Sequence, residues 1–333
     1  VSDGVEPPEI DLTLEYKYKD DNNKEAWKPL ATVTLDGEED SESAYYYEWE
    51  AWNAVWMDLP LAIKDSALED GKTVYRVVES SENGYVQTSE EGTYTDAKFP
   101  QYRFTNVEET SFSVQKVWSG VPDEKRTAIT VGLYRTTDAS KKNVETDAVI
   151  ENGKQKTVTL SSNPWKHTFE GLPKFKVNDD GTKAEYTYYA REMVKVTANG
   201  NEKYEPLPEE IDITTDADKM KQISDDLYGV YHKDNATIVN VGKTSIEGTK
   251  TWKDNGNNYG ARPDELELVL YRQIEGGEAE KVEKVAPSWP NFDPDLETWT
   301  YKYENLPAAD KDGNLYTYSV KETAPKVDGG SDS

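Results

Sequence analysis

The sequence predicts an all-β protein, built from three tandem antiparallel β-sandwiches of the immunoglobulin-like kind. One phrase recurs three times: two aromatic residues, then Leu-Pro, then a tyrosine-rich run that ends in Glu. Many short segments alternate apolar and polar residues, which is typical of half-buried strands. Turn sequences such as Asn-Gly and Asp-Gly separate these segments. A sandwich architecture accounts for all three observations.

The recurring phrase also predicts the domain organisation. Its copies occupy residues 52–79, 165–192 and 299–322. We therefore expect three domains: repeat 1 (residues 1–108), repeat 2 (109–243, with an insertion near 199–235) and repeat 3 (244–333). Each is long enough to bury a core of its own. The junctions are only a few residues long, so the repeats should follow one another end to end with restricted swing.

Composition excludes several functional classes. The chain has 333 residues, and 65 acidic against 38 basic side chains give a net charge of −27. Such a charge argues against binding to nucleic acid or anionic lipid, because phosphate recognition depends on Lys and Arg. The absence of Cys removes disulfides, thiolate metal sites and Cys nucleophiles together. No apolar run approaches membrane length, so no membrane insertion is expected.

Candidate catalytic and cofactor sites are few. His167 and His232 are the two histidines, too few for metal or Ser-His chemistry, and both are expected to be surface or strand residues. No glycine-rich phosphate loop is present. Residues 310–314 begin like a calcium loop, but Lys321 stands where the distal Glu belongs, so a hairpin turn is predicted. We expect no metal, no cofactor and no enzymatic turnover.

Strand assignments follow from period-two alternation. Residues 112, 114, 116 and 118 share one face of a first strand in repeat 2, and residues 246, 248, 250 and 252 do so in repeat 3. Residues 129–135 and 266–272 are expected to form further strands. Two segments are expected to be helical, residues 41–54 and, within the insertion of repeat 2, residues 216–227.

A lysine on the inward face is the exception to this pattern. Lys116 and Lys250 each lie two residues before a Trp, on the face that should be buried. A buried Lys is costly unless it is paired or loses its proton. Each of these repeats also carries a Glu on its late tyrosine-rich strand, Glu192 and Glu322, and repeat 2 ends on Asn240.

At these positions the sequence resembles a known family, the B-type (Cna-B) repeats of Gram-positive collagen adhesins and of the backbone pilins built from similar modules. The resemblance rests on residues 248–254, on Arg262-Pro followed by Leu270-Tyr-Arg, and on residues 318–325, which are similar to the glutamate box of pilins. It covers repeat 3 best, repeat 2 well and repeat 1 partially.

The resemblance implies a spontaneous isopeptide bond between a first-strand Lys and a last-strand Asn, promoted by the neighbouring Glu. In repeat 2 these are Lys116, Asn240 and Glu192. Burial should lower the lysine pKa and leave a neutral amine as nucleophile. The same burial should keep the Glu protonated, so that it donates to the Asn carbonyl. Folding supplies the proximity.

The outer repeats depart from this pattern. Repeat 3 has Lys250 and Glu322, but the 11 residues after Glu322 are too short for a returning last strand, so the partner of Lys250 stays unassigned. Repeat 1 has Glu79 and Asn106, whereas alignment on Tyr18 puts Tyr16 at the lysine position. A phenol is not an amine nucleophile, so no bond is predicted there. Lys17 and Lys19 have the opposite parity and should face solvent, unless a bulge turns Lys17 inward.

The predicted function is therefore mechanical. We expect the extracellular stalk of a cell-wall-anchored Gram-positive adhesin or pilin. A pilin would be linked to other subunits by a sortase, although neither a Leu-Pro-x-Thr-Gly motif nor a convincing pilin-linking Tyr-Pro-Lys is present. The alternative is a ligand-binding adhesin whose first repeat contacts a host matrix protein or glycan. The aromatic cluster of residues 45–47, 49, 52 and 56 supports this alternative if its rings are exposed.

Overall fold

The computed structural model describes residues 9–36, 47–50, 53–56, 59–60, 62–64, 66, 68–69, 72–80, 84–88, 104–178, 181–198, 200–258, 260, 262–263 and 266–323. These residues form an all-β structure of several mainly antiparallel sheets. The chain divides into two compact units, and each is described by itself. Unit 1 comprises residues 1–111 and 169–186, and unit 2 comprises residues 112–168 and 187–333.

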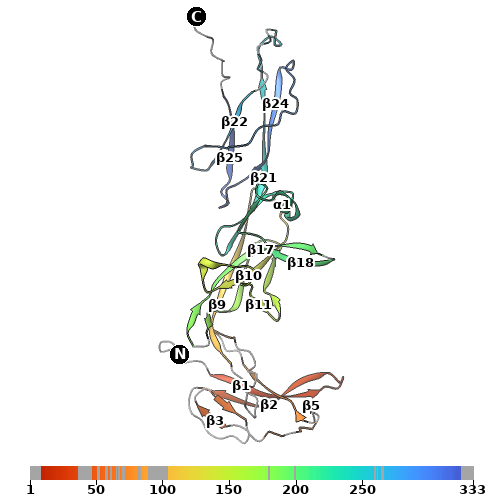
Figure 1. Ribbon diagram of the computed structural model, residues 1–333, viewed down its shortest axis with the longest axis vertical. Coiled ribbons are helices and arrows are strands. Elements are labelled where there is room, and N and C mark those ends of the chain that lie inside the picture. The colour runs from red at the N-terminus through yellow and green to blue at the C-terminus, as the bar shows by residue number, and fades with distance from the viewer. Residues whose placement is uncertain are drawn as a thin grey trace. The chain divides into compact units, whose positions relative to one another are not determined.

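Unit 1 is organised around β1, which lies beside β2 in Figure 1. It pairs antiparallel with β2 on one side and with β7 on the other. Alternate residues of β1 point inward, so Leu12 packs with Val33 and Leu35 in a small apolar core. The strands of this unit are β1 (Ile10–Lys19), β2 (Glu25–Leu35), β3 (Tyr47–Glu50), β4 (Asn53–Val55), β5 (Leu68–Glu69), β6 (Lys72–Thr73), β7 (Tyr75–Glu79), β8 (Tyr85–Gln87), β15 (Phe175–Val177) and β16 (Lys183–Glu185).

Two strands belong to both units, β9 (Asn106–Ser119) and β14 (Lys166–Pro173). Unit 2 otherwise contains one α-helix, α1 (Ala217–Ile223), two short 3₁₀ turns (Asp123–Lys125 and Ala139–Lys141) and the remaining strands. These are β10 (Ile129–Thr136), β11 (Ile150–Glu151), β12 (Lys154–Gln155), β13 (Thr157–Leu160), β17 (Thr187–Ala198), β18 (Asn201–Pro206), β19 (Glu210–Asp212), β20 (Leu227–His232), β21 (Thr237–Thr251), β22 (Leu268–Ile274), β23 (Glu280–Lys281), β24 (Thr298–Pro307) and β25 (Tyr316–Glu322).

Three larger sheets and the two-stranded pair β11-β12 build the described part of unit 2. One has the order β13-β10-β17-β18, a second contains β14-β9-β21-β20-β19, and a third has the order β23-β22-β25. The tyrosine-rich strands β17 and β25 pair antiparallel with β10 and β22 at equivalent registers, Val131 opposite Glu192 and Leu268 opposite Glu322. The inner faces of β10 and β17 are fully buried at Val131, Leu133 and Tyr189.

Strand β21 is continuous over 15 residues and serves two sheets in turn (Figure 1). Its first part, residues 237–241, runs parallel to β9, and its second part, residues 243–251, pairs antiparallel with β24. Asn240 and Lys250 lie on this one strand, ten residues apart (250 − 240). The same separation holds between Asn106 and Lys116 on β9 (116 − 106). Each long strand therefore carries an Asn near its start and a Lys further along.

Backbones approach closely where β21 passes from one sheet to the next. A methyl group at Gly242 would stand 2.3 Å from the carbonyl oxygen of Gly120, and one at Gly120 would stand 2.2 Å from the Cβ of Ala308. Ser119 Oγ donates to the carbonyl of Gly313 at 2.9 Å. Glycine is required at residues 120 and 242 because no Cβ fits there.

Several sequence predictions can be compared with the structure. The inward alternation of β9 is confirmed: Val114 and Lys116 are buried, with exposed neighbours between them. The helix predicted over residues 216–227 is present but shorter, as α1, whose N-cap Asp216 accepts from Lys219 N–H at 2.9 Å and whose C-cap is Ser224. The predicted helix over residues 41–54 is wrong where it is described, because β3 and β4 form a hairpin there. Its aromatic residues favour strand over helix.

Two further predictions concern loops and rings. Residues 310–314 form the expected turn, in which Asp310 accepts from the backbone N–H groups of Asp312 and Asn314. Of the aromatic cluster, the structure gives the side-chain environment of Trp56 alone, half-buried against the core of unit 1. The other rings lie outside the residues whose side chains are described, so the binding surface expected there stays a prediction.

Candidate crosslinking site

Three predicted residues of repeat 2 come together in the interior of unit 2. Lys116 of β9, Glu192 of β17 and Asn240 of β21 are all buried, with 4%, 3% and 0% of their surface exposed. Lys116 Nζ donates to Glu192 Oε2 at 2.9 Å, and Asn240 Nδ2 donates to Glu192 Oε1 at 3.3 Å. One carboxylate therefore lies between the amine and the amide.

Strand register explains this convergence. In the parallel pair of β9 and β21, Trp118 lies opposite Asn240 and Lys116 lies opposite Ile238. Lys116 and Asn240 are thus offset by two positions on adjacent strands, and a period of two puts their side chains on one face. The opposing sheet contributes Glu192, at the position of β17 paired with Val131.

The electrostatics favour a reactive amine. Burial lowers the pKa of Lys116 to about 8, although the Glu192 charge and hydrogen bond act in the opposite direction. The ammonium also lies 4.8 Å from the centre of the Trp118 ring. Near neutral pH the amine is therefore far easier to deprotonate than an exposed lysine.

The amide of Asn240 is only half satisfied. Its Nδ2 donates to Glu192, but Oδ1 is buried without a hydrogen-bond partner. Leaving a buried acceptor unpaired costs about 1–3 kcal/mol. Buried polar atoms without a hydrogen-bond partner are rare in folded proteins. This one is the oxygen of the carbonyl group that a nucleophile would attack.

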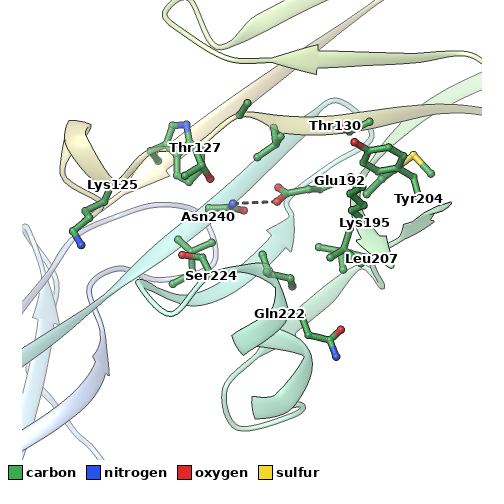
Figure 2. A pocket seen from close by; sticks show the side chains of 17 residues that line it. Lys125, Thr127, Thr130, Glu192, Lys195, Tyr204, Leu207, Gln222, Ser224 and Asn240 are labelled. Carbon is green, nitrogen blue, oxygen red and sulfur yellow. Dashed lines mark hydrogen bonds between the residues drawn. The ribbon is translucent and has the colours of Figure 1, made fainter. Parts of the chain in front are cut away.

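A cavity of about 230 Å³ adjoins the amide and the carboxylate. Figure 2 shows Asn240 and Glu192 pointing toward each other at its wall, with Ser224 of the insertion and Leu207 nearby. The cavity provides room beside the amide for a small molecule to enter or leave.

His232, on β20, is a contributor that sequence reasoning missed. It is the strand residue that we expected, but its Nε2 accepts from the backbone N–H of Glu192 at 3.0 Å, and its Nδ1 contacts the carbonyl of Glu209 at 3.0 Å. Burial, together with the nearby Arg191 charge, lowers the pKa of His232 to about 3. The neutral imidazole fixes the backbone that carries the carboxylate. The sequence signal that could have indicated a buried histidine is its place at the end of the apolar run of residues 227–231.

Repeat 3 brings two predicted residues together. Lys250 Nζ contacts both carboxylate oxygens of Glu322, each at 2.8 Å. The side chains are 22% and 38% exposed, so this ion pair is more accessible to solvent than the pair of Lys116 and Glu192 in repeat 2. Both lysines lie beside an edge-to-face Trp pair, Trp118–Trp165 at 5.3 Å and Trp252–Trp299 at 5.2 Å. Among the described residues, which end at 323, no Asn contacts this pair.

Repeat 1 requires a correction. Glu79 and Asn106 do meet, with Nδ2 donating to Oε1 at 2.9 Å. Tyr16, however, does not occupy the lysine position. Glu79 pairs with Leu12 of β1, as Glu192 pairs with Val131 of β10, so β1 corresponds to β10 rather than to the lysine strand β9. The alignment on aromatic residues was wrong because β1, like β9, alternates inward and outward residues, and Tyr16 is one of the inward residues of β1. Lys17 lies in an ion pair with Glu25 at 3.0 Å.

The described residues contain no group of three or more His, Cys, Asp or Glu side chains that could hold a metal ion. None of the helices in the described part of the chain is long and apolar enough to cross a membrane.

Comparison with known proteins identifies the family of the chain. The Cna protein B-type domain matches residues 112–216 and 246–329, more than half of the sequence. The chain belongs to the Cna B-type domain family. Members of this family are structural modules rather than enzymes, so the expectation of no enzymatic turnover is confirmed.

A curated relative, a collagen adhesin of Staphylococcus aureus, is 25% identical over 325 residues. The match covers 95% of this chain but 22% of the relative, so the chain spans about a fifth of that protein's length. Two crystal structures of the pilus adhesin SpaC from Lactobacillus rhamnosus GG are also similar, each at 13% identity. Their TM-scores are 0.23 and 0.22, with 98% and 95% of this chain and 36% and 33% of those chains covered.

Proposed function

We propose that this chain is a stalk segment of a Gram-positive surface adhesin or pilin, and that Lys116 and Asn240 are joined in it by a self-formed isopeptide bond. The observation that carries the proposal is the buried constellation of Lys116, Glu192 and Asn240. Family membership and the adhesin names of the relatives support the surface role.

The reaction balances without any external reagent. The neutral Nζ of Lys116 attacks Cγ of Asn240, a C–N bond forms, and the bond from Cγ to Nδ2 breaks. Glu192 accepts a proton from Nζ and delivers it to Nδ2, which leaves as ammonia. Rotation of the amide about its Cβ–Cγ bond would bring Oδ1 to the carboxyl group, whose proton then stabilises the oxyanion.

The neighbouring structure fits this chemistry. The cavity beside Asn240 and Glu192 offers the leaving ammonia a path away from the amide. His232 holds the backbone of Glu192 and thereby the carboxylate between its two partners. The acid, amine and amide come from three different strands, so bond formation follows folding of repeat 2.

A bond between β9 and β21 has a mechanical consequence. These are the first and last strands of repeat 2, so tension applied at its ends would pass through the covalent link instead of the hydrogen-bonded sheet. We further propose that each repeat is an immunoglobulin-like sandwich domain with the predicted boundaries, residues 1–108, 109–243 and 244–333. Three such domains in series would hold a binding region away from the cell wall and resist shear and proteolysis.

Intact-mass spectrometry of the purified chain tests the crosslink. One bond lowers the mass by about 17 Da, the mass of one ammonia. The deficit should disappear in Lys116→Ala and in Glu192→Ala. The matched control Lys195→Ala, which removes an exposed lysine three residues from Glu192, should keep it. A wild-type mass equal to that calculated from the sequence would overturn the proposal.

A further inference from the structure

The hairpin that follows the Leu-Pro phrase of repeat 3 has no part in the crosslink. It comprises residues 308–316, between β24 and β25, and a bridge between Ala309 and Leu315 closes it. Ala309 is 2% exposed, whereas Leu315 is 60% exposed. The two sides of one short hairpin therefore have very different surroundings.

Repeat 2 supplies the surroundings of Ala309. Its side chain packs in an apolar cluster with Tyr231, Val239 and Val241. These three other buried members of the cluster all lie on β20 and β21 of repeat 2. Burial of apolar surface is the main favourable contribution to a contact of this kind. A hairpin residue of repeat 3 is thus part of a core that the preceding repeat builds.

Backbone carbonyls fix the position of the hairpin on repeat 2. The N–H of Ala308 donates to the carbonyl of Gly242 at 2.9 Å, and the hydroxyl of Ser119 donates to the carbonyl of Gly313 at 2.9 Å. The first bond holds the start of the hairpin on β21, and the second holds its tip on the end of β9. The contact is therefore specific in register as well as apolar.

Two ion pairs surround this contact. Lys233 and Asp312 lie 3.3 Å apart, and Lys311 pairs with Glu210. Each pair joins the tip of the hairpin to repeat 2. Exposed ion pairs contribute little to stability, so the apolar cluster and the backbone bonds carry most of the contact energy.

Unit 1 contains the same backbone bond at the corresponding hairpin, β15-β16. The N–H of Lys174 donates to the carbonyl of Glu108 at 2.8 Å, as that of Ala308 does to Gly242. In both cases the donor is the residue after Leu-Pro, and the acceptor lies 66 positions earlier (174 − 108 and 308 − 242). The contact is therefore a recurring feature of the repeat.

The hairpin of repeat 3 lies behind the strand that carries Asn240. Val239 and Val241 flank Asn240 on β21, and successive side chains of a strand point to opposite faces. Because Asn240 faces Glu192, its two neighbours face Ala309. Repeat 3 thereby covers the outer face of the last strand of repeat 2.

We propose that residues 308–316 are a docking element by which repeat 3 binds the outer face of β20 and β21, and that repeats 2 and 3 form one rigid body. Domains of one chain move relative to each other unless an apolar interface restrains them, and the shared cluster is such a restraint. The docking explains why a Leu-Pro phrase and a hairpin recur together. It goes beyond the crosslink and needs no bond between Lys116 and Asn240.

Thiol protection in the whole chain tests the docking. The chain has no Cys, so one introduced thiol reports its own surroundings. Ala309→Cys places a thiol in the shared cluster, and Leu315→Cys places the matched control across the same hairpin. Reaction with a maleimide, followed by intact mass, should be about tenfold slower or more at residue 309. Adding Tyr231→Ala in repeat 2 should raise the rate at residue 309 by about tenfold and leave the rate at residue 315 unchanged.

Two results would overturn the docking. Equal rates at the two positions would show that repeat 2 does not cover Ala309. Protection at residue 309 that survives Tyr231→Ala would show that repeat 3 buries this residue by itself.

A second measurement leaves the cluster intact. Lys233→Cys combined with Asp312→Cys replaces two partly exposed side chains that lie 3.3 Å apart across the contact. A short bismaleimide should join the two thiols within one molecule and add the mass of one linker. Two linkers on each molecule, one at each thiol, would refute the docking. The mass deficit of repeat 2 is read in the same spectra, so failure of the docking and failure of the crosslink are distinguished.

Discussion

The substitution Asn240→Ala tests how much the crosslink stabilises repeat 2. It removes the acceptor but leaves the ion pair of Lys116 and Glu192 intact, so no buried charge is stranded. It also removes an amide oxygen that has no partner. The loss of the covalent bond should therefore dominate the change in unfolding free energy.

The magnitude follows from the loop that the bond closes. Residues 116 and 240 are 124 positions apart (240 − 116). Chain-entropy arguments give about 5 kcal/mol for a cross-link across a loop of roughly 120 residues. With an unfolding entropy of about 2.1 cal/mol/K per residue, this loss over residues 109–243 lowers the Tm by about 15–20 °C.

Differential scanning calorimetry on wild type and variant, each paired with its intact mass, measures the effect. Asn201→Ala, at an exposed position on β18, is the matched control and should keep both the mass deficit and the Tm. If Asn240→Ala loses the deficit but its Tm falls by only about 3 °C or less, the entropic reasoning is refuted. If the variant retains the deficit, the assignment of Asn240 is wrong.

Three other predictions follow from the same structure. The pKa of Lys116 is lowered to about 8 and its neutral amine is the nucleophile, so the bond-forming rate after cell-free synthesis should rise with pH up to about 8 and level off above it; a rate that stays flat or falls between pH 6 and 8 would contradict attack by the neutral amine. The pKa of His232 in the folded protein is lowered to about 3. Between pH 6.5 and 3, this imidazole is therefore protonated in the unfolded chain but neutral in the native state. Stability should thus decline by several kcal/mol between pH 6.5 and 3, and His232→Gln should show a smaller decline in Tm; equal declines would refute the role of this imidazole. Gly242→Ala should destabilise unit 2 by about 1–3 kcal/mol, because its Cβ would meet the Gly120 carbonyl, while Ser245→Ala on the exposed face of the same strand should change denaturant midpoints little.

Much of the repeat 2 site was predictable from local pattern. Lys116 was conspicuous because a charged residue fell on the buried phase of an alternating strand, and period-two geometry is a property of the backbone. Glu192 and Asn240 lie at the ends of tyrosine-rich and apolar runs, and the resemblance to the B-type repeats gave them their predicted roles. The helix expected over residues 216–227 is present as α1, which begins after its N-cap Asp216.

Strand pairing could not be predicted in the same way. Tyr16 and Lys116 both occupy inward positions of alternating strands, and alternation alone does not tell which neighbour a strand selects. The registers of β1 against β7 and of β10 against β17 identify β1 as the counterpart of β10. The hairpin of β3 and β4 was missed for a similar reason, because a short polar-aromatic segment takes its conformation from the partner beside it.

The sequence by itself determined the all-β class of the fold, because this depends on local periodicity, and its resemblance to the B-type repeats singled out Lys116, Glu192 and Asn240 as candidates for the crosslink. The tertiary structure alone decided which groups meet. It placed one carboxylate between Lys116 and Asn240, left Asn240 Oδ1 and Glu79 Oε2 unpaired, and put His232 behind Glu192. Such contacts join strands that are 40 to 76 residues apart in the chain, and their distances are set by register and packing rather than by any local run of residues.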